Sequence, residues 1–426
     1  MSESETDIAL NDYLTQYLLR YFRNAVSIPT SKPEAGDDED KELLRLHWAI
    51  SEPVRRLSAH ISERRHEIQA VLGTRRREDD ARVRGRFDAR ATAIRRLETG
   101  HPTLTVSHEA VRHFDSGPNH VLTWVLEQAW RLAGMFREML PTGASYLEKV
   151  EGSANELEVI RRFDAIHQAA KQINLSRRPG RAALKEASRS RRQIYVLAYE
   201  AYTALQEIEA GEEEALRRLL NDTLLGPLQT WKRFELAMGL GVSRGLSSAL
   251  GLPVRLGFFA GGGEPISRIG SYEVYWQIRT GSYKQPTREP SEEIVARLLE
   301  QYGISEGGDR PDLVVLDQQT GKVVAIAEVK YFANEESDGG DALRTAIGQL
   351  VRYARGYRSM VEIDNLLDHS IAALFRSDDA WMPNPKPYGL PLVVDFGGIT
   401  GDQLNSWAQR LVAETQGSPK ALSQAG

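Results

Sequence analysis

Three charged residues, Asp312, Glu328 and Lys330, stand at the ends of two apolar runs, and their spacing could assemble a metal site. Residues 310–331 read RPDLVVLDQQTGKVVAIAEVKY, two apolar runs separated by a short polar gap. In an antiparallel hairpin, Asp312 would lie directly across from Glu328, with Cβ atoms about 4.5–5.5 Å apart. Lys330 would share the face of Glu328, because side chains alternate along a strand. The pattern predicts two carboxylates and one ammonium at one end of a mostly apolar sheet.

This register depends on where the chain turns. A turn on QQTGK sets Asp317 opposite Val323, and the pairing then carries Asp312 to Glu328. Opposed carboxylates repel one another unless a cation lies between them. Two carboxylates suit Mg²⁺, or Mn²⁺ in its place, and such a metal activates water and stabilises charge on a phosphoryl oxygen. The alternative is a solvated hairpin face that carries an ordinary Glu–Lys ion pair.

Residues outside the hairpin offer support for such a site. In the helical segment DALRTAIGQLVRYARGY, Gln349 and Tyr353 are four residues apart and would be neighbours on one face, where they could contact a phosphate backbone. We expect the buried stripe of this helix on a different face, at Leu343, Ile347, Leu350 and Ala354. An amphipathic helix without a functional role explains the same residues nearly as well.

A third acidic residue could complete the site. Glu235, in WKRFELAMGLGVSRGLS, lies among apolar neighbours, where a carboxylate is costly unless it is paired or bound to metal. An exposed position for Glu235 is about equally consistent with the sequence. Glu273, in SYEVYWQ, is the rival, although it falls in an expected strand and could face solvent.

The elements that would hold these residues indicate an α+β protein. Residues 10–22 are amphipathic at helical spacing, the acidic stretch 29–42 is typical of a loop, and residues 41–220 have mostly helical patterns. After about residue 250, short runs rich in β-branched and aromatic residues predict strands. A helix is expected at about 341–360, and a last one from a capping box at Thr400 to about Thr415.

Composition narrows the function classes. The 426 residues carry a net charge of −5, so contact with nucleic acid would have to come from local patches. The absence of cysteine excludes disulfides, thiolate zinc sites and thiol nucleophiles. The chain has no apolar run of membrane-spanning length and no signal-like start, so we expect a cytoplasmic protein without a membrane partner.

One local patch is rich in arginine. The segment from Arg55 to Arg96 holds thirteen arginines, among them Arg75, Arg76 and Arg77. A basic helix face could hold DNA phosphates. Acidic residues are interspersed through the segment, so a solvated helix laced with ion pairs is about as consistent with it.

The motifs resemble those of a known family. Pro311-Asp312, Glu328-Val329-Lys330 and the QLVRY of 349–353 are similar to the PD-(D/E)XK nuclease superfamily, in particular its RecB-like branch and McrC-like restriction components. The resemblance implies Asp312 and Glu328 as metal ligands, Lys330 as the catalytic lysine and Glu235 as the first-helix acidic residue. Gln349 and Tyr353 take supporting or DNA-contacting positions. The chain departs from the family in the long interval between Glu235 and Asp312, which includes an insert near 284–300.

The resemblance also implies an organisation and a function. We expect an N-terminal segment with an acidic linker (1–40), a mostly helical domain that binds DNA or a partner (41–225), a restriction-endonuclease-like α/β nuclease core with a central mixed sheet (226–416) and a disordered tail (417–426). The expected activity is Mg²⁺-dependent cleavage of DNA, in a bacterial restriction or anti-phage system. A non-catalytic nuclease-like subunit that binds DNA or activates an NTPase is the alternative, and RNA as substrate stays open.

Partners follow from the same expectation. The glycine run GFFAGGGEP lacks the Gly-Lys-Ser/Thr of a phosphate-binding loop, so an NTPase or helicase motor would be a separate chain. The sequence leaves open whether the protein forms an oligomer.

Overall fold

The chain forms two compact units. The computed structural model describes residues 5–27, 36–140, 147–257, 264–278, 283–284, 301, 310–332, 339–358, 361, 363–376 and 391–417. The first unit comprises Met1–His47, Glu138–Glu148 and Glu209–Gly426, and the second comprises Trp48–Arg137 and Lys149–Ile208. The domain boundaries drawn from the sequence stay a prediction. Most of the expected insert (285–300) and of the expected tail (418–426) lies outside the described residues.

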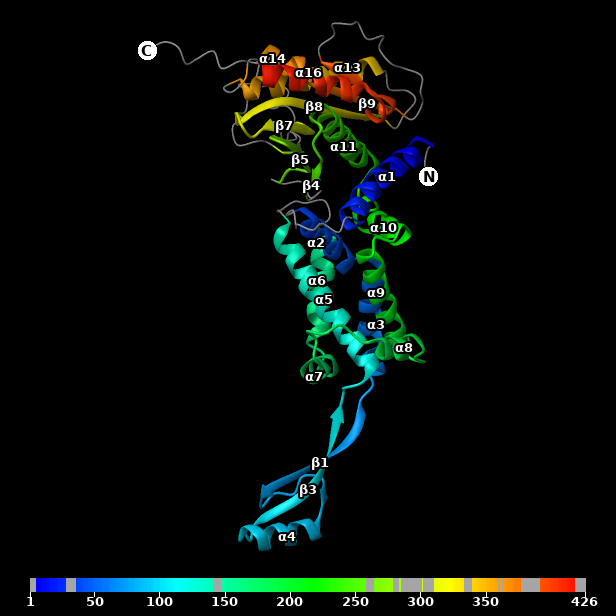
Figure 1. The fold of residues 1–426 in the computed structure, drawn as a ribbon, viewed down its shortest axis with the longest axis vertical. Coiled ribbons are helices and arrows are strands. Elements are labelled where there is room, and N and C mark those ends of the chain that lie inside the picture. The colour runs from blue at the N-terminus through cyan, green and yellow to red at the C-terminus, as the bar shows by residue number, and fades with distance from the viewer. Residues whose placement is uncertain are drawn as a thin grey trace, which may run out of the picture. The chain divides into compact units, whose positions relative to one another are not determined.

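A mixed seven-stranded sheet organises the first unit (Figure 1). The strand order is β10-β9-β8-β7-β6-β5-β4, with β8, β9 and β10 parallel to one another and the other neighbours antiparallel. The strands are β4 (Arg255–Leu256), β5 (Ser267–Ile269), β6 (Tyr272–Trp276), β7 (Leu313–Asp317), β8 (Lys322–Phe332), β9 (Ile371–Arg376) and β10 (Leu392–Val394). Together with the helices they confirm an α+β fold with a central mixed sheet.

The hairpin β7–β8 departs from the predicted register near its turn. Asp317 lies opposite Lys322 and not opposite Val323, so that part of the prediction was wrong. A β-bulge between Val315 and Leu316 places one extra residue, Val324, in β8. Beyond the bulge, Leu313 pairs with Ala327, and the next step along this register carries Asp312 to Glu328 as predicted. The predicted turn was thus misplaced by one residue, and the extra residue in the bulge restores the predicted pairing on the far side of it.

Two long helices cover opposite faces of the sheet. α11 (Thr230–Leu250) packs on β5, β6 and β8, and α13 (Gly339–Tyr357) packs on β8 and β9. Val314 belongs to a hydrophobic core cluster that includes Leu350 of α13, whereas Leu313 lies against Gly239 of α11. Because neighbouring residues of a strand point to opposite faces, the two helices lie on opposite sides (Figure 1).

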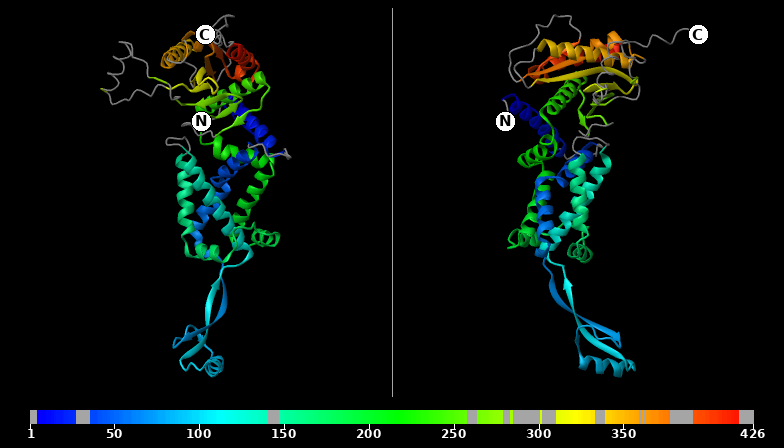
Figure 2. Two further views of the ribbon diagram at one scale, coloured as in Figure 1. Left: turned by 60° about the vertical axis from the view of Figure 1, so that its left-hand side comes forward. Right: turned by 180° about the vertical axis from the view of Figure 1, so that it is seen from behind.

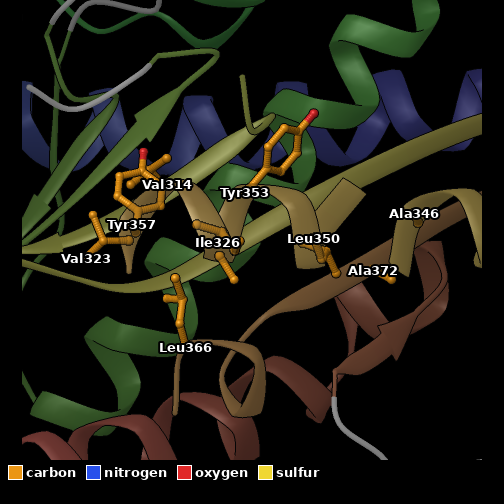
Figure 3. Packing of buried hydrophobic residues seen from close by; sticks show 10 residues of the cluster. Val314, Val323, Ile326, Ala346, Leu350, Tyr353, Tyr357, Leu366 and Ala372 are labelled. Carbon is orange, nitrogen blue, oxygen red and sulfur yellow. The ribbon is translucent and has the colours of Figure 1, made fainter. Parts of the chain in front are cut away.

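The packing of α13 differs in part from the predicted stripe. Leu350 and Ala354 are fully buried as expected, but Leu343 and Ile347 are only half-buried. Tyr353 is buried with Leu350 and belongs to the core face, which corrects its assignment to a different face. Figure 3 shows Tyr353 and Tyr357 on the same helix as Leu350, packed over the sheet residues Val314 and Ile326.

The remaining helices of the first unit surround this sheet or precede it. They are α1 (Glu5–Ser27), α2 (Gly36–Ala49, which ends in the second unit), α10 (Glu213–Leu220), the π-helical turn η2 (Asn221–Leu225), α14 (Ile363–Asp368), α15 (Phe396–Thr400) and α16 (Gln403–Gly417). α1 buries Leu10, Leu14 and Leu18 at the predicted helical spacing. The acidic residues from Asp37 on lie in α2, so the predicted loop was wrong there.

The second unit is a helical bundle that carries a small sheet. Its helices are α3 (Glu52–Arg64), the 3₁₀ turn η1 (Arg65–Glu67), α4 (Ala89–Thr99), α5 (Gly117–Met139), α6 (Leu147–Arg161), α7 (Asp164–Gln172), α8 (Arg181–Ser188) and α9 (Gln193–Glu209). Buried polar contacts tie the bundle together: Tyr195 donates to Asn119 at 2.7 Å, and Trp48 donates its indole N–H to the Ala201 carbonyl at 2.9 Å.

Residues 71–113 form a small arginine-rich sheet and one helix, in a region that the sequence predicted to be mostly helical. The strands β1 (Val71–Asp80), β2 (Arg86–Phe87) and β3 (Leu104–His113) pair in the order β1-β3-β2, with α4 packed on β3 (Figure 2). The helical prediction was right for α4 and wrong for the strands, among which β1 is exposed or half-exposed along its whole length. Such a strand has no alternating apolar face for the sequence pattern to report. In the part of the chain that the structure describes, no helix is both long and apolar enough to cross a membrane.

Candidate active site

Asp312 and Glu328 meet at the end of the hairpin. Asp312 Oδ2 accepts a hydrogen bond from the Val329 backbone N–H at 2.7 Å, which fixes the aspartate beside the strand that carries Glu328. Glu328 is only 3% exposed, so its carboxylate is held away from water. The structure thus brings together the two carboxylates on which the sequence prediction depended.

Lys330 and Tyr353 both interact with Glu328. The Lys330 ammonium lies 2.6 Å from Glu328 Oε1. Tyr353 from α13 also forms a hydrogen bond with the Glu328 carboxyl, which partly opposes the rise in pKa that burial causes. The second oxygen, Oε2, is buried and has no hydrogen-bond partner among the described residues. One oxygen of Glu328 is therefore engaged by the lysine, and the other is left as a buried acceptor.

Glu235 joins this cluster from α11. Its side chain is 4% exposed, and Oε2 accepts hydrogen bonds from Trp276 Nε1 at 2.6 Å and from Gln277 Nε2 at 2.7 Å. Both donors come from the end of β6. The backbone pairing of β6 with β7 extends one step further there, because the Gln277 N–H donates to the Asp312 carbonyl at 2.8 Å. Of the two positions that the sequence left open for Glu235, the structure has the buried one.

Burial and charge repulsion raise the pKa values of the carboxyls in this cluster. Burial, followed by repulsion from Asp312, raises the pKa of both Glu235 and Glu328 to about 8. Burial likewise raises the pKa of Asp312, against the lowering effects of the Val329 N–H, Lys330 and Arg310. Repulsion from Glu328 also raises the pKa of Glu235. Because Asp312 acts on both glutamates and Glu328 acts on Glu235, the three carboxyls belong to one electrostatic cluster.

Glu273 is not part of this cluster. Its carboxylate accepts hydrogen bonds from Arg268 at 2.9 Å, from the Tyr275 hydroxyl at 2.5 Å and from the Gln318 side chain. These hydrogen bonds lower the pKa of Glu273 against the effect of its burial, whereas the pKa of Glu235 is raised. Glu273 is satisfied by a structural network, so Glu235 is the third acidic residue of the cluster.

The other predicted residues have different surroundings. Gln349 is half-buried on α13, and its Oε1 is a buried atom without a partner among the described residues. Arg75, Arg76 and Arg77 lie on β1 in the second unit. Arg76 and Arg77 form ion pairs with acidic side chains, whereas Arg75 has no ion-pair partner among the described residues.

The donor set suits a hard divalent cation, although the carboxylates are not yet arranged around one. Carboxylate oxygens are the ligands that Mg²⁺ and Mn²⁺ prefer, and the buried Oε2 of Glu328 is an acceptor without a donor. No group of three or more Asp, Glu or His side chains in the described ranges stands close enough to hold a metal ion as it is. Lys330 instead supplies the positive charge that balances Glu328. Metal binding would therefore require the Lys330–Glu328 pair to adjust.

Sequence reasoning missed the residues that orient Glu235. Trp276 and Gln277 were part of an expected strand end, and nothing in their spacing indicates a hydrogen bond to a helix about 40 residues away in sequence. Gln277 also has a positive φ of 53°, which only the three-dimensional structure reveals. Arg310 stands in the same stretch as Asp312, but its charge was not assigned a role.

Comparison with known proteins finds a distant structural similarity. No protein-family model and no curated protein matches the chain. Among solved structures, this chain is similar to a chain of the refined half-complex from a tetradecameric assembly of Thermococcus gammatolerans McrB AAA+ hexamers with bound McrC. The identity is 12% and the TM-score is 0.23, over 94% of this chain and 76% of the other.

Proposed function

We propose that this protein is a metal-dependent endonuclease of the PD-(D/E)XK type that cleaves DNA. The observation that carries the proposal is the cluster at the end of the hairpin, where Glu235, Asp312 and Glu328 repel one another and Lys330 lies 2.6 Å from Glu328. Buried carboxylates that raise one another's pKa are costly to stability. Such a cost is typical of a functional site and is relieved when a cation binds.

The residues of the cluster have distinct roles in this proposal. Asp312 and Glu328 would hold Mg²⁺, or Mn²⁺ in its place, and Glu235 would complete the set from α11. A bound cation of this kind activates water and stabilises the charge that develops on a phosphoryl oxygen. Lys330 orients the attacking water or neutralises charge at the phosphate, and Tyr353 holds Glu328 from the helix behind it. Gln349, one turn earlier on that helix, is a supporting residue.

The wider setting rests on the resemblance of the motifs. We propose that the protein acts in a bacterial restriction or anti-phage system, together with an NTPase or helicase supplied by a separate chain. Arg75, Arg76 and Arg77 of the second unit are proposed to contact DNA phosphates. Among them Arg75 is the best placed, because its guanidinium has no ion-pair partner among the described residues.

The proposal is tested by removing each charged group in turn. Asp312→Ala, Glu328→Ala and Lys330→Ala should each lower Mg²⁺-dependent cleavage of plasmid DNA by on the order of 10²–10³-fold, the usual effect of losing a group that stabilises charge in the transition state. Circular dichroism and thermal unfolding should show that the variants stay folded.

Lys322→Ala is the matched control for the lysine. Lys322 lies at the start of the same strand but is exposed, and the variant should cleave like the wild type. Equal cleavage by the wild type and all three site variants would refute the proposed nuclease. A wild-type protein that stimulates an NTPase but cleaves neither DNA nor RNA would instead identify a non-catalytic subunit.

A further inference from the structure

An unusual backbone conformation lies beside the carboxylate cluster. Gln277 has a φ of 53°, in the left-handed region that residues other than glycine adopt rarely, and it is one of two such residues in the described part of the chain. A side chain in this region is strained and persists only where the surrounding contacts hold it. Its contacts therefore indicate what the conformation provides.

Three hydrogen bonds hold Gln277 between the two sides of the site. Its backbone N–H donates to the Asp312 carbonyl at 2.8 Å, and its side-chain Nε2 donates to Glu235 Oε2 at 2.7 Å. The side-chain oxygen of the same amide accepts from Arg310 Nη2 at 3.0 Å. A single amide thus joins the buried Glu235 to the exposed Arg310, and its two ends cannot be exchanged without losing both hydrogen bonds.

Arg310 stands at the open side of this chain of hydrogen bonds. Its side chain is exposed, has no ion pair with any described carboxylate and lies close enough to Asp312 to lower the pKa of that carboxyl. The hydrogen bond to Gln277 uses one of the five guanidinium N–H groups. The other N–H groups have no hydrogen-bond partner among the described residues, and a guanidinium with such donors suits the oxygens of a phosphate.

We propose that Arg310 binds a phosphate of the nucleic-acid strand beside the carboxylate cluster, and that Gln277 is the positioning residue that aligns Arg310 with Glu235. This inference rests on the proposed nuclease function and adds a substrate-binding residue to it. Gln277 fixes the orientation of the Glu235 carboxylate from one end and of the Arg310 guanidinium from the other. It thereby links the substrate contact to the metal-binding carboxylates.

Kinetics on duplex DNA test the role of Arg310. Arg310→Ala should raise KM roughly 10–100-fold, the equivalent of one charge-assisted hydrogen bond of about 1.5–3 kcal/mol, with little change in kcat. The slope of log KM against log salt concentration should fall by about 1, as expected when one phosphate is no longer bound. Arg344→Ala is the control, because Arg344 is an exposed arginine of α13 in the same unit and, among the described residues, forms an ion pair with Asp341 alone.

Gln277→Asn tests positioning separately. Asparagine tolerates the left-handed region, so the backbone is kept while the shorter side chain cannot span from Glu235 to Arg310. We expect the variant to stay folded without metal, with a cooperative thermal unfolding transition and a somewhat lower melting temperature, because the buried Glu235 loses one donor. The affinity for Mn²⁺, measured by thermal shift without DNA, should weaken about 10–100-fold, as is usual when a group that orients a metal ligand is removed. KM for DNA should rise as well.

The outcomes separate this inference from the nuclease proposal. If the wild type cleaves DNA and Arg310→Ala matches Arg344→Ala in KM and salt slope, the phosphate contact is refuted and the nuclease stands. If Gln277→Asn binds Mn²⁺ as the wild type does, the positioning role is refuted. A wild type without metal-dependent cleavage refutes both.

Discussion

At the scale of single residues, the three carboxyls of the cluster link stability to pH. Glu235 and Glu328 have folded-state pKa values near 8, above the value of about 4.3 for an unfolded glutamate. The folded protein therefore binds more protons than the unfolded chain between these two values. Since the free energy of unfolding falls with pH wherever the folded state binds more protons, the cluster destabilises the metal-free protein progressively as pH rises from about 4.3 to about 8.

A divalent cation should reverse this loss. We expect the melting temperature of the metal-free protein to fall between about pH 6 and about pH 8.5, and Mn²⁺ to raise it more at the higher pH, because carboxylates bind metal only after losing their protons. At a concentration of about 100 times the Kd, a bound ligand adds about 2.7 kcal/mol of stability. Thermal unfolding at several pH values, with and without Mn²⁺, measures both effects.

Glu328→Gln provides the comparison for this experiment. The substitution keeps the shape of the side chain and removes one of the repelling charges, so the melting temperature without metal should depend less on pH. The same pH dependence in both proteins would contradict the assignment of the repulsion to this cluster.

The sequence could predict the pair in the hairpin but not the whole site. Asp312 and Glu328 interrupt apolar strands of period two, and this period alone decides which side chains share a face. The β-bulge moved the turn by one residue without disturbing the pair, because it lies between the turn and the site. The donors to Glu235 could not be predicted, since they depend on how α11 crosses the sheet. Trp276 and Gln277 are ordinary strand-end residues until that crossing is known.

At the scale of elements, glycines decide how closely α11 approaches its neighbours. A Cβ on Gly245 would lie 2.7 Å from the Leu404 backbone oxygen of α16. Backbone cannot move aside as a flexible side chain can. Gly348 of α13 is the contrasting case, because a Cβ there would meet nothing within 4 Å. The two glycines occupy the same kind of helical position and differ in what surrounds them.

Alanine at these two positions should have opposite effects. Gly245→Ala should destabilise the protein by about 1–3 kcal/mol through overpacking. Gly348→Ala should stabilise it by roughly 0.5–1 kcal/mol, because alanine loses less backbone entropy in a helix. Chemical denaturation of both variants measures the difference, and a neutral Gly245→Ala would show that α11 and α16 can separate at little cost.

Elements with a buried face were the ones that the sequence predicted. α1 repeats Leu10, Leu14 and Leu18 on one side, and β8 is apolar where both faces of the sheet are covered. The strand β1 fails this condition, because it has no buried residue and its three consecutive arginines are followed by three acidic residues. Hydrophobic periodicity reports burial, so an element that buries nothing gives the sequence no period to detect.

At the scale of the whole molecule, charge is distributed unevenly along the chain. Residues 71–113 hold ten arginines and six acidic residues, a formal charge of +4 within a protein of −5. Val71 and His113 are paired at the base of this arginine-rich sheet, so both of its chain ends meet at one point. The segment could therefore be removed and the chain rejoined by a short linker without stretching the rest.

Removing this segment tests whether it binds phosphates. Replacement of residues 71–113 by two glycines should leave a cooperatively unfolding protein that still binds Mn²⁺ with the wild-type affinity, because no residue of the carboxylate cluster lies in the segment. The salt dependence of DNA binding should become less steep by about 0.9 for each phosphate that the segment neutralises in the wild type. Arg75→Ala alone should account for about one such phosphate, and Arg77→Ala for less, since Arg77 is already held 2.9 Å from Glu109. An unchanged salt dependence after removal of the segment would exclude these arginines from the DNA interface and assign their charge to another partner.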